Sequence, residues 1–190
     1  MKIYLASWFG SQTDRQKARQ DLQAAGMICT ARWLDEKPCE SSDESTRHHS
    51  FALTADMDLQ DLTTADVTVL FTVDPAEPLS HTGGRHFEAG YAYGQCVMAH
   101  IFLQNYAAFG LFMRPHQLIT VGPRENVFHH LPGIRNFPTW AEALVWLQAQ
   151  AKLVDAMDLE IYRGKQCGEV TGGQDLIDAA NGIEKKTVVN

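Results

Sequence analysis

Short apolar runs alternate with stretches of helical periodicity along most of the chain. The runs are rich in β-branched and other apolar residues and predict five strands, over residues 2–7, 27–33, 65–73, 96–103 and 117–121. The run at 65–73 is apolar almost throughout, as expected of a parallel strand that is covered on both faces. The run at 117–121 is stopped by Gly122-Pro123, and we expect it to form an edge strand.

Between these runs, apolar residues recur every three or four positions and predict four helices, which begin at Ser11 or Thr13, at His48, at Arg85 and after Thr139. Gly26 ends the first helix and Thr64 the second. The positions expected to face the core are Ala18, Leu22, Ala25, Phe51, Ala55, Leu59, Leu62, Trp140, Ala143, Leu144 and Leu147. The polar stretch at 34–46 predicts a long surface loop.

Alternating strands and helices are typical of one fold class. They predict a single doubly wound α/β domain over residues 1–154, Rossmann- or flavodoxin-like, whose mostly parallel sheet carries helices on both faces. After residue 154 the pattern weakens, and the stretch at 164–190 is polar and rich in glycine. Residues 155–190 are therefore predicted to form a C-terminal extension or a loosely ordered tail.

Length, charge and cysteine content limit the possible partners. A chain of 190 residues is long enough for a proper core. A formal charge of −7 argues against a nucleic-acid polymer as partner, although a local arginine or helix start can still hold a small anion. The four cysteines form no Cys-x-x-Cys pair, and no window is apolar enough to span a membrane. We expect a cytoplasmic protein without a membrane partner.

The stretch from Gly83 to Gly94 carries the strongest chemical signal. It places Glu88 on the opening turn of a helix, after a glycine-bearing loop and a buried strand. In doubly wound folds, strand, loop and helix start in this order form a ligand site at the carboxyl end of the sheet. A buried carboxylate is costly as packing, which favours a functional group. A solvated acidic residue favoured by the helix dipole is the alternative.

Several segments give the chain a family resemblance. It resembles the nucleoside 2-deoxyribosyltransferase family, which includes the related nucleoside 5′-monophosphate N-glycosidases. The matching segments are Ile3–Ala6, Asp58–Leu62 running into Ala65–Val67, and Phe87–Ala92, all within the first hundred residues. Later segments, Val121–Asn126 and Phe137–Trp140, are similar to phage-type members.

The resemblance implies catalytic residues. Family members cleave the N-glycosidic bond of 2′-deoxynucleosides or their 5′-monophosphates through a covalent glycosyl-enzyme. Glu88 occupies the place of the family's nucleophile, and Asp58 that of an aspartate that positions or protonates the base. Tyr4 occupies the place of a tyrosine that orients the nucleophile, although a core tyrosine with a satisfied hydroxyl is an equal alternative.

Departures from the family pattern concern the sugar site. Family transferases usually carry an aspartate near the sugar hydroxyls where this chain has Thr82, and the loop at 75–82 is longer than usual. The resemblance also implies a homo-oligomer with shared sites, in which Asn126 and the segment 129–130 reach a neighbouring subunit's crevice.

The chemistry of the reaction agrees with this assignment. Cleavage of an N-glycosidic bond develops positive charge at the sugar carbon and negative charge on the departing base. A carboxylate beside the sugar carbon stabilises the first, and a second carboxyl group protonates the base. Glu88 and Asp58 suit these roles. Asp56 and Asp61 lie on the same predicted helix as Asp58. Either of them is the partner of Glu88 if the helix faces the site with a register shifted by one turn.

Residues beside the glutamate and after the first strand are candidates for holding the substrate. Gly83 and Gly84 permit close backbone approach, so amides at the helix start can receive a 5′-hydroxyl or a phosphate, and Arg85 adds positive charge. Ser7 and Trp8 end the first strand and are candidates for lining the base or sugar pocket. The alternatives are a simple tight turn, a solvated Arg85 and a Trp8 in the core.

The eight histidines do not predict a metal site. The adjacent pairs His48-His49 and His129-His130 cannot project onto one helical face. His81 and His86 lie five apart with glycines between them, unlike a zinc ligand set. We expect no metal and no other cofactor.

Three functions remain open. The deoxyribose passes to an acceptor base in a transferase and to water in a hydrolase, and a non-catalytic module would only bind the nucleotide. The expected partners are small-molecule nucleosides or nucleotides and free nucleobases. The presence of Tyr4, Asp58 and Glu88 together favours an enzyme.

Overall fold

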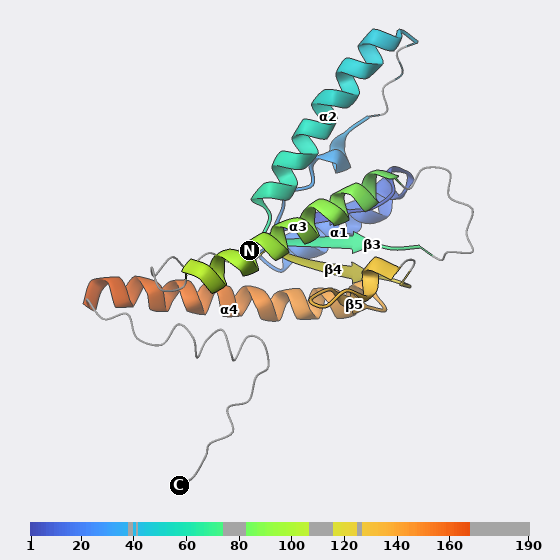
Figure 1. Cartoon of the computed structure of the whole chain (residues 1–190). Coiled ribbons are helices and arrows are strands. Elements are labelled where there is room, and N and C mark those ends of the chain that lie inside the picture. The colour runs from blue at the N-terminus through green and yellow to red at the C-terminus, as the bar shows by residue number, and fades with distance from the viewer. Residues whose placement is uncertain (38–39, 41, 74–82, 107–115, 125–126, 168–190) are drawn as a thin grey trace. The chain divides into compact units, whose positions relative to one another are not determined.

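The computed structural model describes residues 1–37, 40, 42–73, 83–106, 116–124 and 127–167. Within this part of the chain, parallel strands form one sheet in the order β2-β1-β3-β4-β5 (Figure 1). They are β1 (Lys2–Ala6), β2 (Ile28–Cys29), β3 (Val67–Phe71), β4 (Gln117–Val121) and β5 (Arg135–Phe137). This is the strand order of flavodoxin-like doubly wound sheets, and it confirms the predicted fold class.

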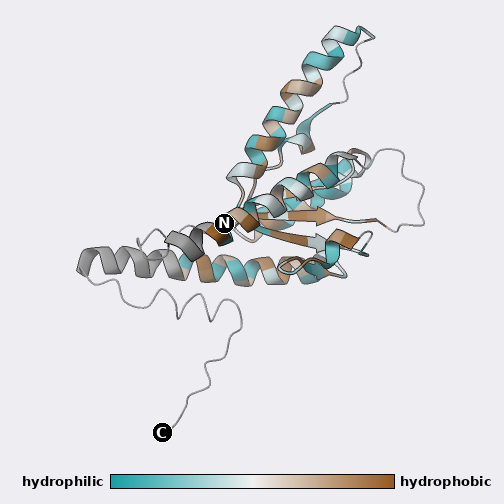
Figure 2. Ribbon diagram, in the orientation of Figure 1, coloured by the Kyte–Doolittle hydropathy of each residue, from teal (hydrophilic) through white to brown (hydrophobic). Residues whose placement is uncertain are grey.

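The central strands form the core of the sheet. All five residues of β3 are buried, and β4 is buried over its last four residues. Both strands consist largely of hydrophobic residues, as Figure 2 shows. The prediction that β4 is an edge strand was wrong, because it pairs with both β3 and β5. The edge position belongs to β5, which has no apolar run. The Asn136 amide ties β5 to β4 by donating to Thr120 Oγ1 (2.8 Å) and to the Gly122 carbonyl (2.9 Å).

The predicted strand at 96–103 was also wrong. Helix α3 runs without interruption over Gly83–Tyr106. Ala92 and Ala99 are buried and Cys96 is half-buried, whereas Met98 and Ile101 are exposed. Inward positions at spacings of four and three are helical, and a short apolar run alone does not distinguish a strand from one face of a helix.

The other helices agree in part with the predicted ones. Helix α1 (Gln12–Ala24) buries Ala18 and Leu22 and is followed by Gly26, whose φ of 75° suits glycine. Helix α4 spans Trp140–Cys167, which is longer than expected. The strand predicted over 27–33 is shorter in the structure, where only β2 (Ile28–Cys29) is a strand. The last predicted strand residues belong to a 3-10 turn, η2 (Arg32–Asp35).

Helix α2 (Glu44–Thr64) begins earlier than predicted. The Asp43 carboxylate accepts a 2.7 Å hydrogen bond from the Thr46 amide and caps it, so the predicted loop at 34–46 is shorter. The prediction that apolar residues of α2 face the core was wrong for the first half of the helix, where Phe51 is 59% exposed. Only the last turns, with buried Leu62, reach the core.

Helices cover both faces of the sheet. On one face the Phe71 ring lies 3.8 Å from the Arg15 guanidinium of α1 and 5.5 Å from the Trp140 ring at the start of α4. Tyr4 of β1 faces the opposite side and contacts α3. The Thr63 hydroxyl of α2 lies 3.0 Å from the Tyr91 hydroxyl of α3, so these two helices lie together.

The chain divides into two compact units, Met1–Leu144 and Val145–Asn190. The described part of the second unit continues α4 to Cys167. The predicted boundary after residue 154 and the loosely ordered tail stay predictions. Among the described residues, no helix combines the length and the apolar character needed to cross a membrane.

Candidate active site

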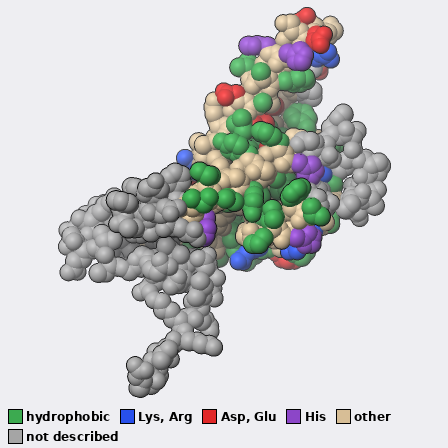
Figure 3. All heavy atoms as spheres, in the orientation of Figure 1, with side chains coloured by type: hydrophobic (Ala, Val, Ile, Leu, Met, Phe, Trp, Pro, Cys, Tyr) green, Lys and Arg blue, Asp and Glu red, His purple; other side chains and the backbone are tan. Residues whose placement is uncertain are grey.

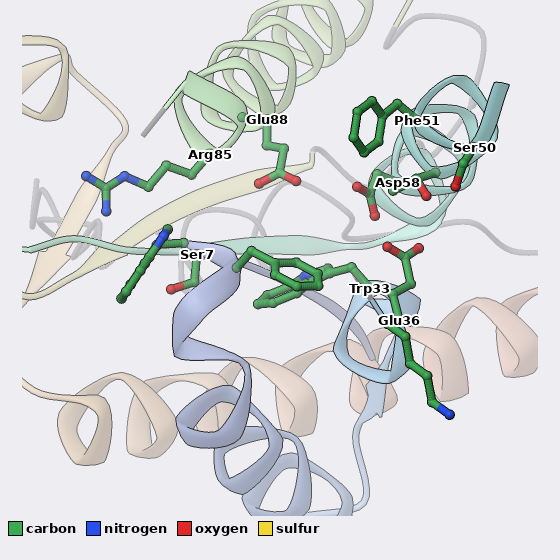
Figure 4. Close-up of a pocket in the computed structure, with 13 residues that line it drawn as sticks. Ser7, Trp33, Glu36, Ser50, Phe51, Asp58, Arg85 and Glu88 are labelled. Carbon is green, nitrogen blue, oxygen red and sulfur yellow. The ribbon is translucent and has the colours of Figure 1, made fainter. Parts of the chain in front are cut away.

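A cavity of about 420 Å³ opens where the first strand ends (Figure 4). Ser7, Trp8 and Phe9 follow β1 directly and form part of its wall. The neighbouring strands β1 and β3 are the topological switch point of this strand order, where doubly wound folds bind ligands. The complete lining is Ser7, Trp8, Phe9, Trp33, Glu36, Lys37, Ser50, Phe51, Thr54, Asp58, Gly84, Arg85 and Glu88.

Glu88 lies on α3 and faces this cavity. The fully buried Tyr4 donates a 2.8 Å hydrogen bond from its hydroxyl to Glu88 Oε1. Burial raises the pKa of Glu88 to about 7, the hydrogen bond from Tyr4 opposes this rise, and the charge of Asp58 adds to it. Burial and the Glu88 carboxylate raise the pKa of Tyr4, so its hydroxyl remains a proton donor. Glu88 is therefore an enclosed, oriented carboxyl group and not a solvated helix-start residue.

Asp58 of α2 lines the same cavity. Burial raises the pKa of its carboxyl group to about 6, and the negative charges of Glu36 and Asp61 contribute. Its Oδ1 atom is buried and has no hydrogen-bond partner among the described residues. The structure thus brings together Tyr4, Asp58 and Glu88 from three different elements.

The two other aspartates of α2 are placed differently. Asp56 is exposed and accepts a 2.8 Å hydrogen bond from the Gln60 amide. Asp61 is buried, but it accepts hydrogen bonds from the Arg32 backbone amide (2.9 Å) and from Arg32 Nε (2.8 Å). Asp58 is therefore the α2 aspartate that faces the cavity.

The predicted substrate-holding residues form the other end of the cavity. The Arg85 side chain is only 4% exposed, and its guanidinium points away from the Glu88 carboxylate, on the side of Ser7 (Figure 4). Gly84 lines the cavity, and a Cβ atom there would meet nothing within 4 Å. Gly83 is the first residue of α3. Thr82 and Asn126, as well as His81, lie outside the described residues.

Sequence reasoning missed the residues that follow β2. Trp33 and Glu36 line the cavity, and the buried Trp33 indole is held by a 2.7 Å hydrogen bond from Nε1 to the Leu5 carbonyl. Phe51 of α2 lies beside Asp58 (Figure 4). The available signal was positional, because residues that follow a strand in this fold lie at the ligand-binding edge of the sheet.

The cavity has two chemically different ends. Arg85 and Ser7 lie at one end, the carboxyl groups of Glu36 and Asp58 lie at the other, and Glu88 lies between them (Figure 4). With pKa values of about 6 and about 7, Asp58 and Glu88 both titrate near neutral pH, so a minor form with Glu88 ionised and Asp58 protonated is present there. Such a site can pair a nucleophilic carboxylate with a proton-donating carboxyl group. Among the described residues, no group of three or more His, Cys, Asp and Glu side chains is arranged to hold a metal ion.

The strand order and this cavity define a flavodoxin-like α/β protein with a carboxyl-lined site at the switch point of its sheet. No protein-family model matches the chain, and a sequence comparison with curated proteins found no match. The solved structure of a 2-deoxyribosyltransferase from the psychrotolerant bacterium Bacillus psychrosaccharolyticus is similar over 76% of this chain and 90% of that one, with 20% identity and a TM-score of 0.48.

Proposed function

We propose that the protein cleaves the N-glycosidic bond of 2′-deoxynucleosides or their 5′-monophosphates and transfers the deoxyribose to an acceptor base. It would be a pentosyltransferase of the nucleoside 2-deoxyribosyltransferase kind. The observation that carries this proposal is the enclosed Glu88 carboxyl group, held by the Tyr4 hydroxyl and accompanied in one cavity by Asp58. The motif that contains Glu88 independently resembles that of the family.

The proposed reaction has two steps. In the first, an ionised Glu88 oxygen forms a bond to C1′ while the bond from C1′ to the base nitrogen breaks, and Asp58 gives its proton to the departing base. In the second, a nitrogen of the acceptor base forms a bond to C1′, the glycosyl ester to Glu88 breaks, and Asp58 recovers a proton from the incoming base. Tyr4 holds the Glu88 carboxylate in one orientation through its 2.8 Å hydrogen bond.

The layout of the cavity supports one orientation of the substrate. With C1′ beside Glu88, the base extends toward Asp58 and the 5′ end of the sugar toward Ser7 and Arg85 (Figure 4). The aromatic rings of Trp8 and Phe51 supply apolar surface for a base or sugar. The buried Arg85 favours the alternative of a nucleoside 5′-monophosphate N-glycosidase, with water as acceptor, because a guanidinium group binds phosphate well.

One experiment separates transfer, hydrolysis and mere binding. The protein is incubated with a panel of deoxynucleosides and deoxynucleotides, with and without an acceptor base, and the products are separated by chromatography. A new nucleoside indicates transfer, free deoxyribose or its phosphate indicates hydrolysis, and unchanged substrates would contradict both.

A variant tests the nucleophile. Glu88→Ala should abolish base release, and intact-protein mass spectrometry of the wild type should detect an added deoxyribosyl group. Glu142→Ala is the matched control, because Glu142 is an exposed glutamate on the first turn of α4. Normal turnover by Glu88→Ala would remove Glu88 from the mechanism.

We also propose that the protein forms a homo-oligomer. Apolar side chains gather on one face of the molecule (Figure 3), and the exposed ones on α3 and on the 3-10 turn η4 (Val127–His130) are Phe87, Tyr91, Val97, Met98, Ile101, Val127 and Phe128. Large exposed apolar patches commonly mark protein interfaces. Light scattering coupled to size exclusion measures the mass directly, and a monomer at micromolar concentration would contradict the proposal.

A further inference from the structure

The carboxyl group of Glu36 has no role in the proposed reaction, yet it points toward that of Asp58 (Figure 4). Glu36 follows η2, and Asp58 lies on α2, so the two meet from separate segments. Glu36 Oε1 and Asp58 Oδ1 are both buried, and neither has a hydrogen-bond partner among the described residues. Buried polar atoms are usually paired, so two neighbouring unpaired acceptors in one cavity call for donors from a ligand.

The nearby cations do not supply these donors. Arg32 directs its side chain to Asp61, to the Met57 carbonyl and to Gln60 Oε1. Lys37 also lines the cavity, but within the described ranges no ion pair joins it to Glu36 or to Asp58. Burial raises the pKa of Glu36, and the charge of Asp61 adds to this rise.

We infer that this pair of carboxyl groups receives the exocyclic amino group of a nucleobase, so that the preferred substrates carry a 6-aminopurine or a 4-aminopyrimidine. The inference rests on the proposed glycosyl transfer and names its substrate class. An exocyclic amino group has two N–H donors in the plane of the base, and it can give one to Glu36 and one to Asp58. A carbonyl oxygen at that place is an acceptor without an N–H group, so it would form no hydrogen bond with the acceptor atom of Glu36 and would be repelled by it.

The direction of the base supports this assignment. With C1′ at Glu88, the Glu36 and Asp58 end of the cavity is the end that the edge of the base reaches, and Phe51 lies beside it (Figure 4). A site whose buried acceptors are satisfied only by one substrate discriminates strongly, since the analogue leaves them unpaired. A lost hydrogen bond to a charged group corresponds to a discrimination of about 10- to 100-fold.

The test compares bases that differ only in this group. Values of kcat/KM are measured for deoxyadenosine against deoxyinosine and for deoxycytidine against deoxyuridine. Binding of free adenine and hypoxanthine to the wild-type protein is measured by titration calorimetry, which needs no turnover. We expect the amino member of each pair to be favoured about 10- to 100-fold.

Glu36→Gln sharpens the test. A glutamine offers an amide N–H to a carbonyl oxygen, so this variant should lower the amino-to-oxo ratio at least about tenfold. Glu40→Gln is the matched control, because Glu40 is an exposed glutamate on the same segment, and it should leave the ratio unchanged. Each amino-to-oxo ratio compares two substrates on the same sample of one variant, so a partial loss of folded protein changes both kcat/KM values equally and leaves the ratio unchanged.

The outcomes distinguish the two proposals. A preference for amino bases that Glu36→Gln reduces supports the inference. Equal values for the amino and oxo members, or a preference that Glu36→Gln leaves intact, would overturn it even if the enzyme turns over. Tighter binding of adenine than of hypoxanthine without any turnover would support recognition of the amino group and refute glycosyl transfer.

Discussion

The Tyr4 hydroxyl on β1 and Glu88 Oε1 on α3 are joined by a 2.8 Å hydrogen bond, although the two residues lie 84 positions apart in the chain. Tyr4 is fully buried, and its hydroxyl contacts Glu88, which lines the cavity. The same residue is thus a core side chain and a support for the candidate nucleophile. The burial and the hydrogen bond are thus observed together, and the role of Tyr4 in catalysis stays a prediction.

Tyr4→Phe should lower kcat by about 10- to 100-fold with little change in KM, because a hydrogen bond to a charged group is lost while the ring remains. The hydrogen bond lowers the pKa of Glu88, which is the higher of the two carboxyl pKa values, so its loss should also move the alkaline limb of the pH profile upward. Tyr91→Phe is the matched control, since its hydroxyl meets Thr63 at the surface. An unchanged alkaline limb in Tyr4→Phe would show that Tyr4 has a packing role alone.

The dependence of kcat/KM on pH should be bell-shaped. Glu88 must be ionised to attack and Asp58 must be protonated to release the base, and their pKa values are about 7 and about 6. Because the pKa of the nucleophile lies above that of the acid, the reactive form is a minor one, and the acidic limb near 6 and the alkaline limb near 7 belong to the coupled pair.

Asp58→Asn tests which group gives the alkaline limb. This variant should be about 10²-fold slower and should keep only the acidic limb. That limb should then report Glu88 alone and lie below 7, because the charge of Asp58 no longer raises the pKa of Glu88. The exposed Asp56, changed to Asn, should leave the bell intact. An alkaline limb that survives in Asp58→Asn would exclude Asp58 as the proton donor.

Ionised Glu88 should destabilise the folded protein. Its pKa rises from an ordinary value of 4.5 to about 7, so the folded state is favoured below 4.5 and loses this advantage as the pH rises through 7. Glu88→Gln cannot ionise and still accepts the hydrogen bond from Tyr4. At pH 8 it should exceed the wild type in free energy of unfolding by on the order of 2 kcal/mol, and at pH 5 by much less.

Urea unfolding at the two pH values measures this difference. Glu40→Gln, a change of the same kind at an exposed glutamate, is the matched control. If Glu88→Gln changed the unfolding free energy equally at pH 5 and pH 8, the carboxyl group would not titrate as described.

Arg85→Ala should selectively lower kcat/KM for deoxynucleoside monophosphates. If the buried guanidinium contacts a 5′-phosphate, kcat/KM should fall about 10- to 100-fold more for deoxynucleoside monophosphates than for the free deoxynucleosides. Arg47→Ala, an exposed change on α2, is the control. Equal losses for both substrate types would refute the phosphate contact.

Asp61→Ala should loosen the segment that carries Trp33 and Glu36. The change removes the acceptor of the Arg32 backbone amide and of Arg32 Nε, and it should lower the free energy of unfolding by about 2 kcal/mol. Chemical denaturation measures this loss, with exposed Asp56→Ala as the control. A loss below about 0.5 kcal/mol, the range of ordinary surface changes, would contradict a structural role for this contact.

Local patterns predicted a large part of the fold. The apolar run of β3, the alternation of elements and the glycine after α1 are properties of neighbouring residues, and they led to the doubly wound sheet. The position of Glu88 after a strand and a glycine loop likewise pointed to the ligand edge. Two errors, the strand at 96–103 and the edge position of β4, arose where an apolar run fits two environments or where pairing depends on a distant segment.

The sequence by itself determined which side chains are able to do chemistry and which segments become strands, because burial periodicity and backbone preference act over a few residues. Only the tertiary structure decided which of those side chains meet. Glu36, Asp58 and Glu88 come from three segments, and they share one cavity because the sheet places β1 between β2 and β3. The raised pKa values of these carboxyl groups follow from that shared enclosure, which no stretch of sequence contains.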